Sequence, residues 1–73
     1  MYAEGDRVKV RYLTENWLDA RVRYTGQLTE KDAVEIQAFA PRAKAGDGYV
    51  GVSIGNQDPI KYLTNSDDIV PVH

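Results

Sequence analysis

The sequence contains no cysteine, and its one histidine, His73, is the last of its 73 residues. Without cysteine, neither a disulfide framework nor a thiolate metal site can form. A lone histidine also excludes a cluster of histidine ligands, and it leaves Ser53 and Ser66 without a histidine base in the middle of the chain. We therefore expect no enzymatic activity, no metal site and no cofactor.

Long apolar runs are also missing, since a helix that crosses a bilayer needs about 20 consecutive apolar residues. Glu4 and Asp6 lie where a secretory signal would carry basic side chains. We therefore expect a cytoplasmic protein with no membrane contact. A chain of 73 residues suffices for one domain, so we predict a single domain over residues 1–73 and a monomer.

The sequence does contain two segments of strict alternation between apolar and polar side chains, residues 7–12 and 17–24. A period of two is typical of a strand with one buried and one wet face. Residues 14–16 form a short polar connection, so we predict an antiparallel hairpin. The side chains predicted to point inward are Val8, Val10, Tyr12, Leu18, Ala20, Val22 and Tyr24.

Three shorter strands are predicted in the second half of the chain, over residues 49–54, 60–63 and 69–72. The first of them alternates, with Val50, Val52 and Ile54 inward, and its glycines Gly51 and Gly55 favour a bulge or a bend. Pro71 cannot donate to a ladder, which is typical of an edge strand. A tight turn or a single 3₁₀ turn is expected near residues 65–68, with Ser66 or Asp67 as its cap and Asp68 solvated.

The segment from Leu28 to Ala40 permits two interpretations. Residues 33–39 alternate, which favours a strand. Thr29, with Asp32 three residues later, resembles a weak capping box, and the composition favours a helix that Pro41 would end. We favour the strand over residues 33–39 and keep the helix as the alternative. Residues 41–48 are predicted to form a loop.

Three short motifs resemble the SH3-like barrel of Tudor and agenet domains. They are Gly5-Asp6-Arg7-Val8-Lys9-Val10, Trp17-Leu18-Asp19-Ala20-Arg21-Val22 and the late Asp67-Asp68-Ile69-Val70-Pro71. The resemblance covers residues 5–24 and 62–72, and small phage proteins share this layout. It implies an all-β fold, namely a small SH3-like (Tudor-like) barrel of about five antiparallel strands.

The net charge is −2, yet the cations are gathered near the start of the chain. Residues 1–24 hold five basic and four acidic side chains, whereas residues 25–73 hold four basic and seven acidic ones. This basic stripe is either a solvated sheet face or a surface that binds phosphate or an acidic protein. Trp17 either contributes to such a surface or caps the core. The candidate binding residues are Arg7, Lys9, Arg11, Trp17, Arg21 and Arg23.

The resemblance and the small size together suggest a phage-type regulator that binds a protein partner. By analogy with SH3-like modules of bacteria and phages, the expected partner is host RNA polymerase, and the expected effect is on transcription initiation or termination. One alternative is a nucleic-acid-binding module that uses the basic face. The other is a Tudor-type reader, which the resemblance implies would hold methylated lysine or arginine in an aromatic cage.

Overall fold

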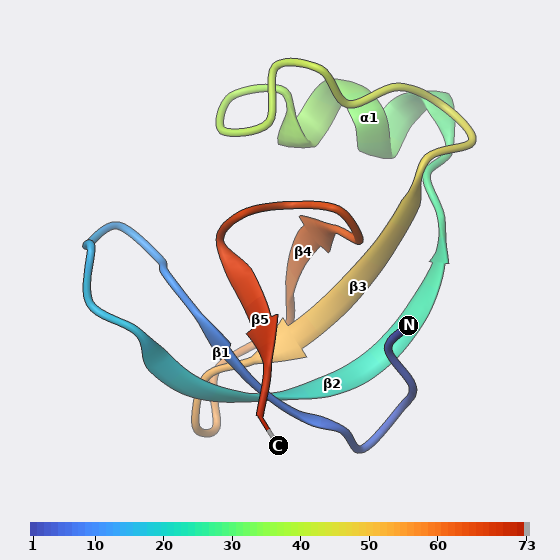
Figure 1. Ribbon diagram of the computed structural model, residues 1–73. Coiled ribbons are helices and arrows are strands. Elements are labelled where there is room, and N and C mark those ends of the chain that lie inside the picture. Colours follow the sequence, from blue (N-terminus) through green and yellow to red (C-terminus); the bar gives the residue numbers. More distant parts are fainter. Residues whose placement is uncertain (73) are drawn as a thin grey trace.

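The computed structural model describes residues 1–72, which form five strands and one helix (Figure 1). The elements are β1 (Arg7–Val10), β2 (Leu18–Gln27), α1 (Glu30–Ile36), β3 (Gly48–Ser53), β4 (Ile60–Leu63) and β5 (Ile69–Pro71). All strands pair antiparallel in one sheet of order β4-β3-β2-β1-β5. The predicted all-β class is confirmed, and the curled sheet is compatible with an SH3-like barrel (Figure 1).

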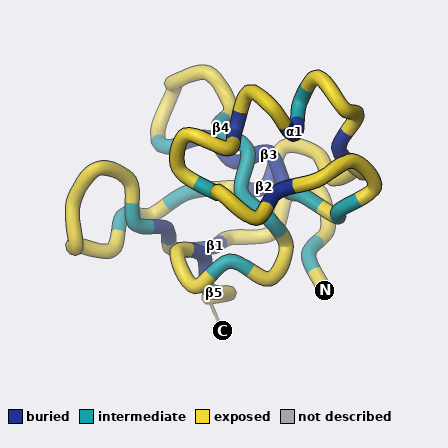
Figure 2. Tube along the Cα trace, turned by 90° about the horizontal axis from the view of Figure 1, so that it is seen from above, coloured by how far each residue is buried: buried dark blue, intermediate teal, exposed yellow. Residues whose placement is uncertain are grey.

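The main core lies on the inner side of this sheet and consists mostly of valines. Five of them are at most 1% exposed, and Ile69 of β5 joins them at 3%. These segments are dark blue in Figure 2. The fully buried valines are Val8, Val10, Val22, Val50 and Val52. The predicted hairpin and its inward positions are confirmed for these residues, and Leu18, Ala20 and Ile54 pack against the same core at partial burial.

Two tyrosines that were predicted to point inward are instead 36% exposed. Tyr12 follows β1, which ends at Val10, so the alternation no longer determines its direction. Tyr24 follows a bulge in β2, between Val22 and Tyr24. One extra residue moves the following side chains to the other face of a sheet.

Gly51 of β3 is the residue that accommodates Tyr24 on the outer side of the sheet. A Cβ atom built on Gly51 would lie 2.3 Å from the Tyr24 ring, so only glycine leaves room for it. Gly51 was predicted to mark a bulge, and the bulge lies on β2, opposite this glycine.

The prediction of a strand over residues 33–39 is wrong, because α1 occupies the first part of this segment. The Thr29 hydroxyl accepts a hydrogen bond from the Asp32 amide at 3.1 Å and caps the helix. Ala33 and Ile36, spaced as one helical face, are buried, whereas Val34 is 68% exposed. The buried side chains of this segment therefore follow helical spacing and not alternation.

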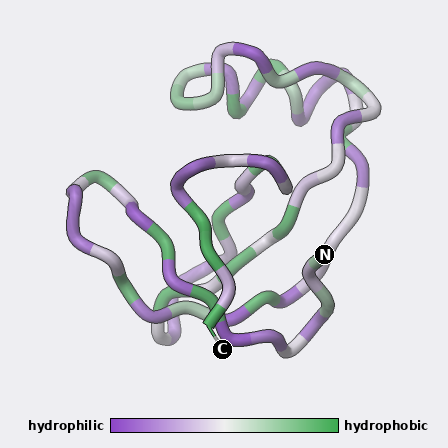
Figure 3. The backbone as a smooth tube through the Cα atoms, viewed as in Figure 1, coloured by the Kyte–Doolittle hydropathy of each residue, from purple (hydrophilic) through white to green (hydrophobic). Residues whose placement is uncertain are grey.

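The helix supports a second, smaller core of Leu28, Ala33, Ile36 and Ala43. Partly buried Tyr49 and Leu63 pack against it, so this cluster touches the sheet where β3 begins and β4 ends. In Figure 3 the helix is mostly hydrophilic with short hydrophobic stretches, as expected for a helix with one narrow buried stripe.

The two edges of the sheet are β4 and β5, which agrees with the prediction for Pro71. The segment that connects β4 to β5 forms tight turns and no 3₁₀ helix. In it, the Ser66 amide donates to the Leu63 carbonyl, and the Ser66 hydroxyl accepts from the Asp68 amide. The Tyr62 hydroxyl donates to the Arg11 carbonyl at 3.0 Å and so ties β4 to the end of β1.

Within residues 1–72, no helix has the length and apolar character needed to cross a membrane.

Candidate functional site

The register of β1 and β2 brings the predicted basic residues together on the side of the sheet opposite the core. Arg7 lies opposite Arg21, and Lys9 lies opposite Asp19. These positions alternate with the buried Val8 and Val10, so their side chains point outward. Arg21 also pairs with Ser53 of β3, whose hydroxyl accepts a hydrogen bond from Arg23 at 3.5 Å.

Trp17 lies immediately before β2 and belongs to the same surface. The Arg11 guanidinium carbon is 4.7 Å from the centroid of the Trp17 ring, a cation–π contact. The ring is part of neither core cluster, and the residue is 42% exposed. We call the surface formed by these six residues the outer face: Arg7, Lys9, Arg11, Trp17, Arg21 and Arg23.

Two carboxylates compensate two of the five cations on the outer face. Asp19 lies 3.9 Å from the Lys9 amine, and Asp68 lies 3.0 Å from the Arg11 guanidinium. Asp68 was expected to be solvated, and its side chain is 53% exposed while Arg11 reaches across from β1 to pair with it. Within residues 1–72, the other three arginines of the outer face form no ion pair.

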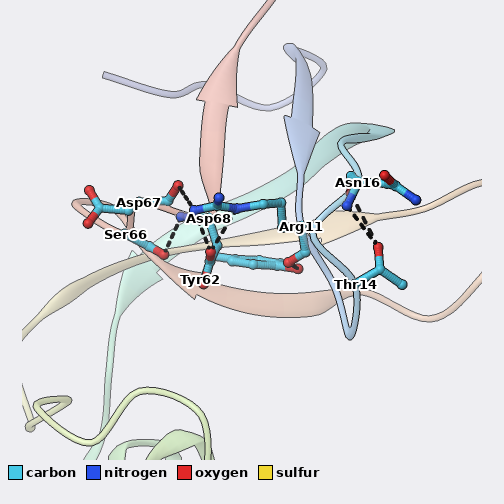
Figure 4. A network of polar contacts seen from close by, with 7 residues as sticks. All are labelled: Arg11, Thr14, Asn16, Tyr62, Ser66, Asp67 and Asp68. Atoms are coloured by element: carbon cyan, nitrogen blue, oxygen red, sulfur yellow. Dashed lines mark hydrogen bonds and ion pairs between the residues drawn. The ribbon is translucent and has the colours of Figure 1, made fainter.

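Arg11 is the centre of a polar network at the end of the sheet (Figure 4). Its guanidinium donates to the Asp68 carboxylate and to the Asp67 carbonyl, both at 3.1 Å. Its carbonyl accepts the Tyr62 hydroxyl. The network fixes the guanidinium over the Trp17 ring, so this part of the outer face is preorganised.

The network also changes the acidity of Tyr62. Burial, followed by the negative charge of Asp68 and by Tyr12, raises the pKa of Tyr62 from 10.0 to about 12. The folded protein therefore holds this proton more tightly than the unfolded chain does. The stabilisation is complete below pH 10 and is lost as the pH rises through 12.

The replacement Tyr62→Phe is expected to lower the free energy of unfolding at neutral pH by about 1 kcal/mol, since one hydrogen bond is lost. It should also remove part of the fall in stability between pH 10 and pH 12. Urea unfolding of both proteins across this range measures the two effects. Tyr24→Phe is the control, because the Tyr24 hydroxyl makes no hydrogen bond within residues 1–72. An equal alkaline loss in wild type and Tyr62→Phe would contradict the assignment.

A groove of about 740 Å³ runs along β4 beside this network. Two strongly exposed apolar side chains line it, Leu13 at 87% and Phe39 at 66%. Leu13 has a φ of 61°, an uncommon conformation for a leucine. Asp67 and Asp68 also line the groove, but residues 1–72 contain no group of three potential metal ligands.

The remaining aromatic rings form one close pair within the described chain. Tyr24 and Tyr49 meet edge to face with centroids 6.0 Å apart, and the Lys61 amine lies 5.9 Å from the Tyr49 centroid. Trp17 lies instead beside Arg11. Trp17 and the Tyr24–Tyr49 pair are therefore each in contact with a cation of the protein itself, Arg11 at Trp17 and Lys61 at Tyr49.

Sequence reasoning selected the six residues of the outer face as binding candidates, which stays a prediction, and it assigned no role beside them to Tyr62 and Asp68, which hold Arg11 in place. Asp68 was visible in the sequence as part of the motif Asp67-Asp68-Ile69-Val70-Pro71, just before an edge strand, and alternation marked no role for Tyr62. His73, noted as the one histidine, lies outside the described residues.

In comparisons with known proteins, no family model, no curated protein and no solved structure matches this chain.

Proposed function

We propose that this protein is a small non-enzymatic binding module that docks on a larger acidic protein through its outer face. The observation that carries the proposal is the exposed Trp17 ring, held against Arg11 beside four further cations. Tryptophan and arginine dominate the energetics of protein interfaces when they become buried. Two ion pairs already anchor part of this face, which lowers the entropy lost on binding.

The net charge of the whole chain supports a protein partner. The protein is negative overall, so its cations attract an acidic surface only when the outer face is turned toward it. Such a local patch orients an encounter and raises its rate. A chain that coats nucleic acid would instead carry a net positive charge.

The resemblance to Tudor-type SH3-like barrels, together with the small size, makes bacterial RNA polymerase the first partner to test. In this proposal the protein is a phage-type regulator that binds the polymerase of its host. By occupying a surface that a sigma factor needs, or by stabilising the elongating form, it would alter initiation or termination. No catalytic step is required, because different affinities for two states shift their populations.

The test mixes purified protein with core polymerase and with holoenzyme in the absence of DNA. We expect a complex at micromolar concentration and a change in promoter-dependent transcription or in terminator read-through. Trp17→Ala should weaken the complex at least about tenfold, as for a residue central to an interface. Absence of a complex, with tight binding to nucleic acid instead, would overturn the proposal.

A nucleic-acid-binding role is the second candidate, and the three unpaired arginines of the outer face favour it. Binding through several phosphate contacts weakens steeply with salt, by about a factor of ten or more over a modest rise in ionic strength. The affinity of a protein interface with Trp17 at its centre should fall less when salt is added. The salt dependence of binding therefore separates the two candidates.

A further inference from the structure

The most unusual feature of the outer face is that two arginines lie directly opposite each other. Arg7 and Arg21 are register partners in β1 and β2. The Val22 amide donates to the Asp6 carbonyl at 2.9 Å, whereas the next carbonyl of β1, that of Arg7, accepts from the Val72 amide on the β5 side at 3.1 Å. Because pair types alternate in an antiparallel ladder, Arg7 and Arg21 form a non-hydrogen-bonded pair, the type whose side chains lie closer together.

Like charges at directly opposed positions destabilise a sheet. The next non-hydrogen-bonded pair along the ladder, Lys9 and Asp19, places opposite charges together and forms an ion pair. No carboxylate lies within ion-pair distance of Arg7 or Arg21 in residues 1–72. Within residues 1–72, no ion pair therefore compensates the repulsion between the two arginines.

Arg23 adds a third cation beside this pair. The bulge after Val22 leaves it without a register partner, and its guanidinium reaches the hydroxyl of Ser53. Ser53 is itself the β3 partner of Arg21, so Arg23 is anchored next to Arg21. All three arginines are exposed.

We propose that Arg7 and Arg21, with Arg23 beside them, form the binding site for one carboxylate side chain of the partner protein. Guanidinium groups bind carboxylates through two parallel hydrogen bonds, and an anion between two of them relieves their repulsion. The inference rests on the proposed docking function and specifies its chemistry. The bound carboxylate would stabilise the complex by forming ion pairs with Arg7 and Arg21, for which residues 1–72 provide no carboxylate partner.

Carboxylates of a protein are favoured over the phosphates of a nucleic acid because the outer face is interrupted by its own acids. Asp19 lies between Trp17 and Arg21 on β2, and Asp68 lies beside Arg11. A continuous phosphate chain along this face would pass both of these negative charges, whereas one carboxylate at Arg7 and Arg21 has only Asp19 near it, whose charge Lys9 offsets. Trp17 lies four residues from Arg21, about 13 Å along the strand. The partner should therefore present an acidic side chain about that far from an apolar one.

The test is Arg7→Glu, which replaces the like-charged pair by an opposed pair and removes the proposed site. We expect the midpoint of thermal unfolding to rise by about 2–6 °C at low salt. A short poly-glutamate peptide should bind the wild type and lose at least about tenfold in affinity for the variant. Added sodium chloride should raise the wild-type midpoint more than that of the variant, because salt screens the repulsion.

Lys9→Glu is the matched control, since it makes the same charge change in β1 but places the new carboxylate opposite Asp19. It should lower the unfolding midpoint at low salt. An unchanged or lower midpoint for Arg7→Glu, or equal poly-glutamate binding by wild type and Arg7→Glu, would overturn the inference. Tighter binding of duplex DNA than of poly-glutamate to these arginines would overturn the choice of a carboxylate.

The polymerase experiment distinguishes failure of this site from failure of the docking function. If Arg7→Glu forms the polymerase complex as well as wild type does, the site is refuted while docking stands. If poly-glutamate binds as expected but no polymerase complex forms, the polymerase is refuted while the site stands.

Discussion

Val10→Asp is expected to abolish folding. Val10 is fully buried at the centre of the valine core, between Ile69 of β5 and Leu18 of β2. An unpaired carboxylate there loses its hydration and finds no partner, which costs more than about 4 kcal/mol. A domain of this size is stabilised by only about 4–11 kcal/mol. The cooperative thermal transition, followed by circular dichroism, should therefore disappear.

Val34→Asp provides the matched control, because it makes the same change on the exposed side of α1. Its free energy of unfolding should fall by less than about 1 kcal/mol, the cost of a weaker helix former. A Val10→Asp protein with wild-type thermal stability would show that this side chain faces water, contrary to the register of β1.

The double charge reversal Arg21→Glu with Arg23→Glu is expected to leave the fold intact and to weaken association with the acidic partner about 100-fold. Both side chains are exposed and neither belongs to a core cluster, so the reversal removes no core packing. The reversal replaces attraction by repulsion over the proposed carboxylate site, so it should slow association as well as weaken the complex. Surface plasmon resonance with immobilised RNA polymerase measures both the rate and the affinity.

The control for this experiment is Lys31→Glu with Lys44→Glu, which changes the net charge equally but lies on α1 and on the loop after it. Its affinity should stay close to that of the wild type, apart from a small general effect of charge. Equal loss in both double variants would mean that overall charge, rather than the outer face, governs binding. Unchanged binding in both would assign the arginines to solubility alone.

The helix α1 shows where sequence pattern was insufficient. Residues 33–39 alternate as a strand does, yet a strand also needs a neighbour to pair with, and pairing depends on the whole sheet. The Thr29 cap was visible in the sequence as a weak capping box, whereas the pairing of Ala33 and Ile36 on one buried side of the helix was not noted. What decided between the two periods was the second core, where Leu28 and Ala43 cover the buried side of the helix.

By itself, the sequence predicted the five strands of the sheet, together with one over residues 33–39 that is absent, and it predicted the side of the hairpin on which the charges of Arg7, Lys9 and Arg21 lie. Alternation specifies both, because a side chain next to a buried valine must point away from the core. This is why Val8, Val10 and Val22 were identified correctly as core, and why Arg7, Lys9 and Arg21 lie on the opposite side of the sheet as predicted. Alternation stops being informative where the strand ends or bulges, so Tyr12 and Tyr24 were misplaced.

Only the tertiary structure decided which charges meet. The opposition of Arg7 and Arg21 depends on the register of the hairpin, which a shift of one residue would destroy. The contact of Arg11 with Asp68 joins residues 57 positions apart, through the pairing of β1 with β5. Such long-range pairs follow from how the sheet curls and which strands become neighbours, and no local pattern contains that information.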